Sequence, residues 1–356
     1  MCWIVVLCAL GVAPASTVQA QGGEHDRFTS LVFPTDNEAI LDGRPERFYM
    51  GLERGFGRER VWAWEGGTYG YVRNARSTPA GWRFTRFHEG IDIAPTRRDA
   101  EGEPLDEVRA VEAGRVVYVN PSASASDYGR YVVVEHEWAD GPFYSLYAHL
   151  AETSVRRGER VRRGERLGIL GYSGRGLDRD RAHVHFEINL LLNEHFDAWR
   201  DARKPRWRTT HGRFHGLNLA GVSPFELLDR STAGVPPSVR ELVEEQYEEV
   251  TVYVPGGSAP DLLTRYPWLC GSCDGVIPER ARSWEVGLTR AGLPVRVEPA
   301  TRRIAAPELG HVEGLVEADY LASRLLTRRG PGAELSRSGR TLVTLLFSRP
   351  DDVPAW

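Results

Sequence analysis

Lysine is almost absent from this 356-residue sequence, because Lys204 is the only lysine among its 45 basic residues. The other basic side chains are arginines, a bias that we attribute to the codon composition of a GC-rich genome rather than to phosphate binding. Acidic residues number 49, so the formal net charge is only −4. A chain with so small an excess of charge has no general electrostatic attraction to nucleic acid or to anionic lipid, and no nucleic-acid partner is expected.

Cysteine is also scarce. The chain has four cysteines, and Cys2 and Cys8 lie in its first residues. The other two, Cys270 and Cys273, cannot form a four-cysteine zinc site. In an oxidising compartment they are expected to form a local disulfide. A thioredoxin-type redox role would need a strand-to-helix setting, and two free thiols are the third possibility.

Long apolar runs are missing except at the start of the chain. Trp3–Val12 is continuously apolar, and the small residues of Val18-Gln19-Ala20 follow it. This pattern predicts a secretory signal peptide over residues 1–20, cleaved after Ala20. A lipid anchor on Cys8 is disfavoured because bulky residues precede it. No later segment is long and apolar enough to span a bilayer, so we expect a mature protein that is secreted or periplasmic and spans no membrane.

The middle of the chain has the pattern of an antiparallel β-sheet. Residues 22–87 predict irregular structure with short strands. From residue 108 onwards, short β-rich runs alternate with glycine turns, and no helical period separates them. The runs expected to be strands are Val108–Ala113, Arg115–Asn120, Tyr131–His136, Phe143–Leu150, Arg166–Gly171 and His183–Leu190.

After Leu192 helical signals appear. Helices are predicted at Glu194–Arg203, from the capping box Ser223-Pro-Phe-Glu226, and from Ser238 to Tyr247. The length favours two domains, and we expect a linker at 233–239 followed by a small α/β domain at 240–356. Its predicted strands are Val250–Val254, Pro294–Val297 and Leu342–Phe347, and its predicted helices are Trp284–Ala291 and Glu317–Arg328.

The sharpest local motif is His183-Val-His185-Phe-Glu187. In a strand, His183, His185 and Glu187 share one face, and the apolar residues between them point the other way. Two imidazoles on one face of a sheet form a platform for a metal ion. Alone, a His-x-His motif is weak evidence for a metal site.

A second motif, His88-Glu-Gly-Ile-Asp92, strengthens the first. Gly90 permits a turn, so that His88 before it and Asp92 after it can converge on one point. Two histidines and one carboxylate give three ligands and leave a fourth position open to water. An open position distinguishes a catalytic zinc site from a structural one.

Together these motifs resemble those of the lysostaphin-type (LytM) endopeptidases of peptidase family M23. The resemblance rests on His88-x-x-x-Asp92, Tyr147-Ala-His149-Leu, His183-x-His185-Phe-Glu and Val111-x-Ala-Gly-x-Val-Val, and it covers about residues 67–190. It implies a mainly β fold, with an antiparallel β-sheet peptidase domain that we place at residues 21–232. It also implies that His88, Asp92 and His185 bind Zn²⁺, that His149 and His183 are catalytic, and that peptidoglycan peptides are the substrate.

The sequence departs from the family pattern in three places. Arg181-Ala182 replaces a small Gly-Pro-like step before His-x-His, residues 96–107 lengthen the loop after Asp92, and residues 194–222 extend the end of the domain. The resemblance gives no account of residues 240–356, and the sequence indicates no oligomeric state.

The chemistry of the residues agrees with the function that the resemblance implies. Zinc lowers the pKa of a bound water from ~15.7 toward ~7. An imidazole that titrates near ~6.5 can take a proton from that water or deliver one to the leaving amine. His149 and His183 are the candidates for these two tasks, which the sequence does not divide between them, and Glu187 is expected to orient a ligand.

The remaining candidates are weaker. His136 is interpreted as a structural strand residue, and His195, His211 and His215 as packed or solvated residues rather than the wall of a groove. Arg73 has either a structural role or a contact with substrate.

Two other functions fit parts of the pattern. A catalytically silent LytM-type protein, which binds the cell wall or activates an amidase, would typically lack one or more of the five site residues, and all five are present. A cupin-like iron oxygenase also uses two histidines and a carboxylate, but at a different spacing. A secreted, zinc-dependent endopeptidase of peptidoglycan is therefore the predicted function.

Overall fold

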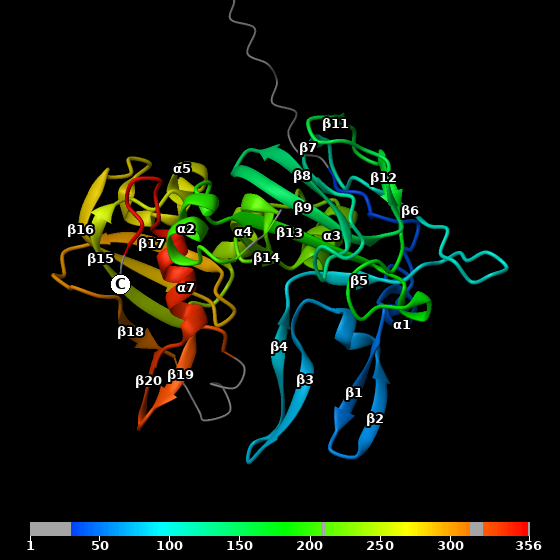
Figure 1. Cartoon of the computed structure of the whole chain (residues 1–356), viewed down its shortest axis with the longest axis horizontal. Helices are drawn as coiled ribbons and strands as arrows, with labels where there is room; N and C mark the ends of the chain where they lie inside the picture. Colours follow the sequence, from blue (N-terminus) through cyan, green and yellow to red (C-terminus); the bar gives the residue numbers. More distant parts are fainter. Residues whose placement is uncertain (1–29, 208, 210, 314–322, 355–356) are drawn as a thin grey trace, which may run out of the picture.

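The computed structural model describes residues 30–207, 209, 211–313 and 323–354. The predicted signal peptide and its cleavage site lie outside these residues. The described chain consists of an antiparallel β unit with two N-terminal hairpins and a C-terminal α/β unit beside it (Figure 1). The predicted fold class is confirmed: the chain is mainly antiparallel β, with an additional α/β unit at its C-terminal end. Within the described residues, no helix is long and apolar enough to cross a membrane.

The largest sheet has seven strands and positions the candidate site. Six strands follow the order β11-β7-β8-β9-β13-β14. The seventh, β5, pairs with the first half of β13, and β14 pairs with its second half. All its pairings are antiparallel. The strands are β5 (Ile91–Ile93), β7 (Gly114–Asn120), β8 (Arg130–Trp138), β9 (Gly141–Leu150), β11 (Arg160–Val161), β13 (Val184–Leu191) and β14 (Leu219–Val222).

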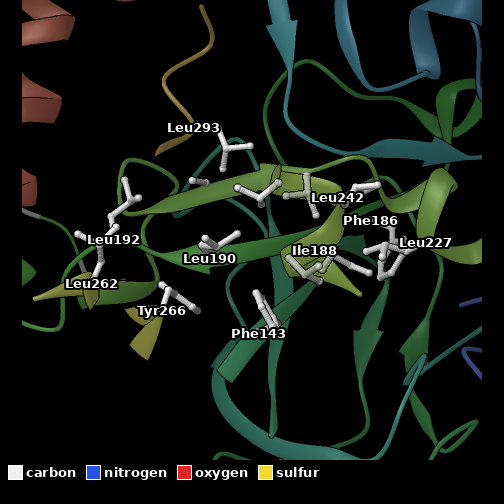
Figure 2. Close-up of a cluster of buried hydrophobic side chains, with 14 of the residues drawn as sticks. Phe143, Phe186, Ile188, Leu190, Leu192, Leu227, Leu242, Leu262, Tyr266 and Leu293 are labelled. Atoms are coloured by element: carbon white, nitrogen blue, oxygen red, sulfur yellow. The ribbon is translucent and has the colours of Figure 1, made fainter. Parts of the chain in front are cut away.

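Strand β13 is buried along its whole length, and its two faces differ in chemistry. Phe186, Ile188 and Leu190 point into the apolar core (Figure 2). His185 and Glu187 lie on the opposite face, as the period of two predicts. His183 precedes the strand and forms an isolated bridge with Gly171.

A three-stranded sheet lies next to the main one, and its strands are shorter than predicted. Its order is β10-β12-β6, with β6 (Glu107–Arg109), β10 (Glu152–Thr153) and β12 (Arg166–Ile169). Bends replace the strand expected at residues 111–113.

The N-terminal region is more regular than expected. Irregular structure with short strands was predicted for residues 22–87. The described part contains α1 (Pro45–Phe48) and two hairpins, β1 (Leu52–Phe56) with β2 (Glu59–Ala63), and β3 (Gly70–Thr78) with β4 (Gly81–His88). Both hairpins extend from the main sheet in the same direction (Figure 1). Few residues of these strands are buried, so the sequence did not show how long the strands are.

Three helices were predicted between residues 194 and 247, and all three are present; only the expected side-chain cap of the second is missing. They are α2 (Phe196–Arg203), α3 (Pro224–Thr232) and α4 (Val239–Glu244). Ser238 caps α4 by accepting a hydrogen bond from the backbone N–H of Glu241 at 3.1 Å. Ser223 occupies the N-cap of α3, but its side chain accepts no capping hydrogen bond.

The C-terminal unit contains a four-stranded sheet in the order β17-β16-β15-β18. Three predictions are wrong here: residues 284–288 lie in a strand, residues 342–346 lie in a helix, and residues 326–328 lie in a strand, while residues 317–322 are outside the described residues. The elements are β15 (Val250–Ser258), α5 (Leu262–Arg265), β16 (Arg280–Leu288), β17 (Pro294–Ala300), β18 (Glu308–Val312), β19 (Leu326–Arg329), β20 (Gly332–Leu335) and α7 (Arg337–Leu346).

One apolar core runs through both units. Tyr266 of the C-terminal unit is fully buried, and its ring stacks on Phe143 of β9 at a centroid distance of 5.6 Å. Its hydroxyl donates to the carbonyl oxygen of Pro142 at 2.8 Å and accepts from the N–H of Leu191 at 3.0 Å. Figure 2 shows Tyr266 next to Phe143 and Leu190 in this cluster.

The two C-terminal cysteines form the predicted disulfide. Cys270 and Cys273 are bonded, with their Cα atoms 5.4 Å apart. They lie around a short 3₁₀ turn, Gly271–Cys273, and not at the junction of a strand and a helix. The setting that a thioredoxin-type redox role would need is therefore missing at this pair.

Candidate metal centre and catalytic histidines

The three predicted metal ligands lie on neighbouring strands. His88 ends β4, Asp92 is the middle residue of β5, and His185 is opposite Asp92 in the register of β5 and β13. The turn between His88 and Asp92 requires glycine, because a Cβ atom on Gly90 would lie 2.2 Å from the carbonyl oxygen of Phe186. The His-x-x-x-Asp motif thus folds back tightly against β13.

The ligand atoms of these side chains converge on one point. Nε2 of His88 lies 3.1 Å from Oδ1 of Asp92, Nδ1 of His185 lies 2.9 Å from the same oxygen, and the two nitrogens are 3.0 Å apart. All three residues are buried. Ligands about 2.0–2.1 Å from a tetrahedral zinc ion are separated by roughly 3.3 Å, so these separations are close to those of a zinc site.

The second nitrogen of each ligand imidazole is held by an acceptor. Nδ1 of His88 donates to the carbonyl oxygen of Thr68 at 2.7 Å, and Nε2 of His185 donates to Glu187 at 2.7 Å. These bonds turn Nε2 of His88 and Nδ1 of His185 toward each other and toward the Asp92 carboxylate. Burial would lower the pKa of His185, but its hydrogen bonds to Asp92 and Glu187 raise it to about 9. A cation bound between the three groups would take the place of this proton, and their N/O chemistry fits Zn²⁺.

Glu187 is the centre of a buried network behind the candidate metal site. Besides the bond from His185, its carboxylate accepts a hydrogen bond from the hydroxyl of Tyr128 at 2.8 Å and from Nδ2 of Asn189 at 2.9 Å. A carboxylate that accepts from a ligand imidazole fixes the tautomer and orientation of that imidazole. The sequence predicted this position for Glu187 but gave no signal for Tyr128, which lies in the loop before β8.

Arg73 lies inside the site. Its guanidinium forms an ion pair with Asp92, and its Nη2 is 3.1 Å from Nε2 of His88. Its Nε donates to the carbonyl oxygen of Gly66 at 2.9 Å. These contacts fit the structural role that the sequence left open, and Arg73 also lines the groove, where the alternative contact with substrate would occur.

The two predicted catalytic histidines lie side by side next to the ligands. The ring centroids of His149 and His183 are 4.7 Å apart, and His149 lies 5.9 Å from His185. Nδ1 of His149 donates to the carbonyl oxygen of Ser173 at 2.9 Å, and Nδ1 of His183 donates to that of Arg181 at 2.7 Å. Both imidazoles therefore keep Nε2 as their lone-pair nitrogen.

His149 has an unusual backbone conformation. It is one of three described non-glycine residues with positive φ, at 62°, and its N–H donates to the carbonyl oxygen of Tyr128 at 2.9 Å. A bulky residue in the left-handed region is strained and persists only where its surroundings enforce it. The conformation turns the chain at the end of β9, next to the site.

Burial sets the protonation of this pair. Burial lowers the pKa of His149 well below its usual value, and the nearby imidazoles of His183 and His185 add to the shift. Burial also lowers the pKa of His183, although Asp92 opposes the shift. Both imidazoles are therefore neutral at pH 7 and can accept a proton.

The carboxylates behave in the opposite way. Burial would raise the pKa of Asp92, but interactions with His88, His183 and Arg73 hold it well below the usual value. Burial would likewise raise the pKa of Glu187, but the hydrogen bond and charge of His185 lower it. Both carboxylates are ionised at neutral pH.

An open groove of about 1200 Å³ gives access to the site. The five candidate residues line it, and Trp207, His211 and His215 form part of its wall. His211 and His215 were predicted to be packed or solvated. Both are packed: the hydroxyl of Tyr118 lies 2.8 Å from Nδ1 of His211, and the ring of Phe196 stacks on His215. Both also line the groove.

Two other histidines lie outside the groove. His136 is buried, with Nδ1 donating to the carbonyl oxygen of Ala113 at 2.9 Å and Nε2 2.7 Å from the hydroxyl of Ser145. Its predicted structural role is confirmed by these contacts. His195 lies before α2, with Nε2 3.8 Å from Asp261.

Comparison with known proteins identifies this part of the chain. The model of peptidase family M23 matches residues 86–197. Residues 86–197 belong to peptidase family M23. This M23 segment contains all five candidate residues, and residues 198–356 lie outside the match.

Two curated proteins similar to this chain are named as a peptidoglycan endopeptidase and as a lipoprotein. The chain is 31% identical over 141 residues to Peptidoglycan DD-endopeptidase ShyB of Vibrio cholerae, covering 40% of this chain and 29% of that protein. It is 32% identical over 102 residues to Lipoprotein NlpD/LppB homolog of Pseudomonas aeruginosa, covering 29% of each. The chain thus spans less than a third of the length of these two relatives.

Among solved structures, the catalytic domain of lysostaphin from Staphylococcus simulans is similar to part of this chain. The identity is 23%, the TM-score is 0.24, and the match covers 34% of this chain and 76% of that chain.

Proposed function

We propose that this protein is a zinc-dependent endopeptidase that hydrolyses peptide bonds in bacterial peptidoglycan. In this proposal His88, Asp92 and His185 hold the zinc ion, and His149 and His183 transfer protons. The observation that carries the proposal is the convergence of two imidazole nitrogens and one carboxylate oxygen within 3.1 Å of one another, beside a second pair of imidazoles. The M23 match and the peptidoglycan endopeptidase among the relatives support the reaction class.

A zinc ion bound there would polarise the scissile carbonyl and lower the pKa of a water toward about 7. The residues of the chain provide the proton transfers. His149 and His183 both expose Nε2 as a base, because backbone carbonyl oxygens occupy their Nδ1–H groups. One imidazole takes a proton from the attacking water at Nε2. That proton then passes to the leaving amine, either directly from this imidazole or through the second one, whose Nε2 must accept the proton before it can donate to the oxyanion or to the amine.

We also propose that the protein is exported and that the peptidase domain extends over residues 21–232. Export is supported by the apolar run at Trp3–Val12 and the small residues before Gln21. The peptidase boundary is supported by β14 and α3, which complete the main sheet and its cover after the M23 match ends. The proposal also includes a linker at 233–239 and a C-terminal domain at 240–356, which shares its apolar core with the peptidase domain.

Digestion of purified peptidoglycan sacculi tests the function. The mature chain is incubated with sacculi, with and without a zinc chelator, and released fragments are identified by mass spectrometry. The His149→Ala and His183→Ala variants are compared with His195→Ala, which removes an imidazole outside the groove. We expect cleavage by the parent and by His195→Ala, and its loss in the other two variants and with chelator.

Two results would contradict the proposal. Cleavage that survives chelation would exclude a zinc-dependent reaction. No cleavage by a parent protein that binds one zinc ion would favour the alternative, a catalytically silent protein that binds the cell wall or activates an amidase. Mass spectrometry also identifies the bond that is cut.

A further inference from the structure

The groove beside the candidate zinc site carries arginines that its own acidic residues do not neutralise. Arg73 pairs with Asp92, Arg175 with Asp127 at 2.8 Å, and Arg324 with Glu89 at 2.9 Å. Arg86 and Arg181 also line the groove, and neither forms an ion pair within the part of the chain that the structure describes. The groove therefore has two positive charges in excess before any metal ion is counted.

Arg181 is held next to a candidate catalytic imidazole. Its carbonyl oxygen accepts the hydrogen bond from Nδ1 of His183 at 2.7 Å, and its N–H donates to Oδ1 of Asp178 at 3.1 Å. The backbone of Arg181 is thus fixed on both sides relative to His183. Asp178 is occupied by this backbone bond and does not pair with the guanidinium.

The guanidinium of Arg181 has unused donors. Its Nε is buried and has no hydrogen-bond partner among the described residues, and its Nη1 makes a single long contact of 3.4 Å with the carbonyl oxygen of Gly176. An arginine presents five N–H donors in a planar fork that matches a carboxylate. A buried donor without a partner is unfavourable, and a bound acceptor would relieve this cost.

We propose that Arg181 binds a free carboxylate of the peptide substrate, close to the scissile bond. This inference rests on the proposed endopeptidase function and narrows its substrate to peptides that carry a carboxylate on the His183 side of the groove. Arg86, on β4 two residues before His88, adds positive charge at the same groove and strengthens the attraction. The carboxylate belongs either to the end of a peptide or to a side chain.

The substrate for the test is a cross-linked disaccharide-peptide dimer, released from sacculi by a glycosidase. One half of the preparation keeps its carboxyl groups, and the other half is amidated with carbodiimide and ammonia. Cleavage of both by the full-length mature protein is compared with cleavage by Arg181→Gln and Arg181→Lys. Arg179→Gln is the matched control, because its guanidinium lies in the same turn but donates to the carbonyl oxygen of Glu101.

We expect Arg181→Gln to lower kcat/KM for the free dimer by about tenfold, mainly through KM, because a hydrogen-bonded charge pair is lost. The same variant should act on the amidated dimer within twofold of the parent, which itself should prefer the free dimer. Arg181→Lys should recover part of the loss, and Arg179→Gln should behave as the parent. Synthetic peptides amidated only at the C-terminus or only at a side chain then identify the source of the carboxylate.

Two outcomes would overturn the assignment. In the first, Arg181→Gln lowers kcat/KM equally for the free and the amidated dimer, which would indicate a structural role. In the second, it changes kcat/KM for neither dimer. If the parent cleaves no dimer, the proposed function fails, and the assignment is decided by binding in a His149→Ala background. In that background, tighter binding of the free dimer than of the amidated dimer, lost on adding Arg181→Gln, would support the carboxylate site. Equal binding of the two dimers before Arg181 is changed would refute it.

Discussion

Glu187→Gln separates the charge of the network behind the metal site from its shape. The side chain is buried, and its carboxylate accepts three hydrogen bonds, from His185, Tyr128 and Asn189. Glutamine has the same size and can still accept from His185 and Tyr128. Its amide N–H₂ would face Nδ2 of Asn189, but Oδ1 of Asn189 has no partner, so a flip of that amide restores the third bond.

Glu187→Gln is therefore expected to lower the affinity for zinc and to leave the stability of the metal-free protein unchanged. A neutral partner makes the imidazole of His185 a weaker ligand, and loss of such a partner typically lowers metal affinity or activity 10- to 100-fold. This corresponds to about 1.4–2.7 kcal/mol of zinc-binding free energy. Zinc affinity is measured by competition with a chromogenic chelator, and urea unfolding of the metal-free protein checks stability.

Tyr128→Phe is the matched control, because it removes one hydrogen bond to Glu187 and keeps the charge. We expect its zinc affinity to stay within about threefold of the parent, in line with a net hydrogen-bond contribution of about 0.5–1.5 kcal/mol spread over the network. A Glu187→Gln variant with unchanged zinc affinity would refute the idea that the carboxylate supports the ligand.

Three further predictions concern stability and the turn at the site. Burial lowers the pKa of His136 to about 4, below its unfolded value of about 6.5. The folded state therefore keeps this imidazole neutral, and stability that is complete above pH 6.5 is lost as the pH falls toward 4. The loss is about 3 kcal/mol. Urea unfolding at pH 7 and pH 4 should show a larger fall in the free energy of unfolding for the parent than for His136→Gln; an equal fall in both proteins would contradict this. Tyr266→Phe leaves the N–H of Leu191 without its partner and should cost about 1–3 kcal/mol, with one unfolding transition by tryptophan fluorescence; a second transition would mean that the two units unfold separately. Gly90→Ala places a Cβ against the carbonyl oxygen of Phe186, so β5 must move from β13, and zinc retained after dialysis should fall well below one equivalent; full retention would show that the turn tolerates a side chain.

The predictability of each element follows from how its residues are buried. In β13 the two faces differ so clearly that the period of two is visible in the sequence. In β16, Trp284, Val286 and Leu288 also alternate toward the core. The helix predicted over them was wrong, because three alternating apolar residues are too few to distinguish a strand from a helix by periodicity. In α7 the composition Leu342–Phe347 favours a strand, but Ser336 caps a helix and its stripe of buried residues faces the core. There tertiary packing overrides local preference.

In the candidate site, the sequence predicted the residues whose side chains form a motif but not the residues that hold those side chains in place. His88, Asp92, His149, His183 and His185 were found because their spacing forms a motif, and the structure brings all five to one groove. The residues that hold them contribute backbone carbonyl oxygens, as Thr68, Ser173 and Arg181 do. A backbone acceptor has no side-chain signature, so no sequence pattern reports it.

The relation between the two units could not be predicted at all, and it decides how the C-terminal unit should be studied. The ion pair of Arg324 with Glu89 joins the units at the groove, but both side chains are more than a third exposed, and such a pair contributes about 0–1 kcal/mol. The buried contact of Tyr266 with Phe143 and Leu191 is the stronger connection. A chain cut near Arg230 would expose that apolar surface to water, so its loss of activity would report unfolding as readily as function. Substitutions at the exposed Arg324–Glu89 pair leave the shared core intact, and they are the better test of whether the C-terminal unit affects the groove.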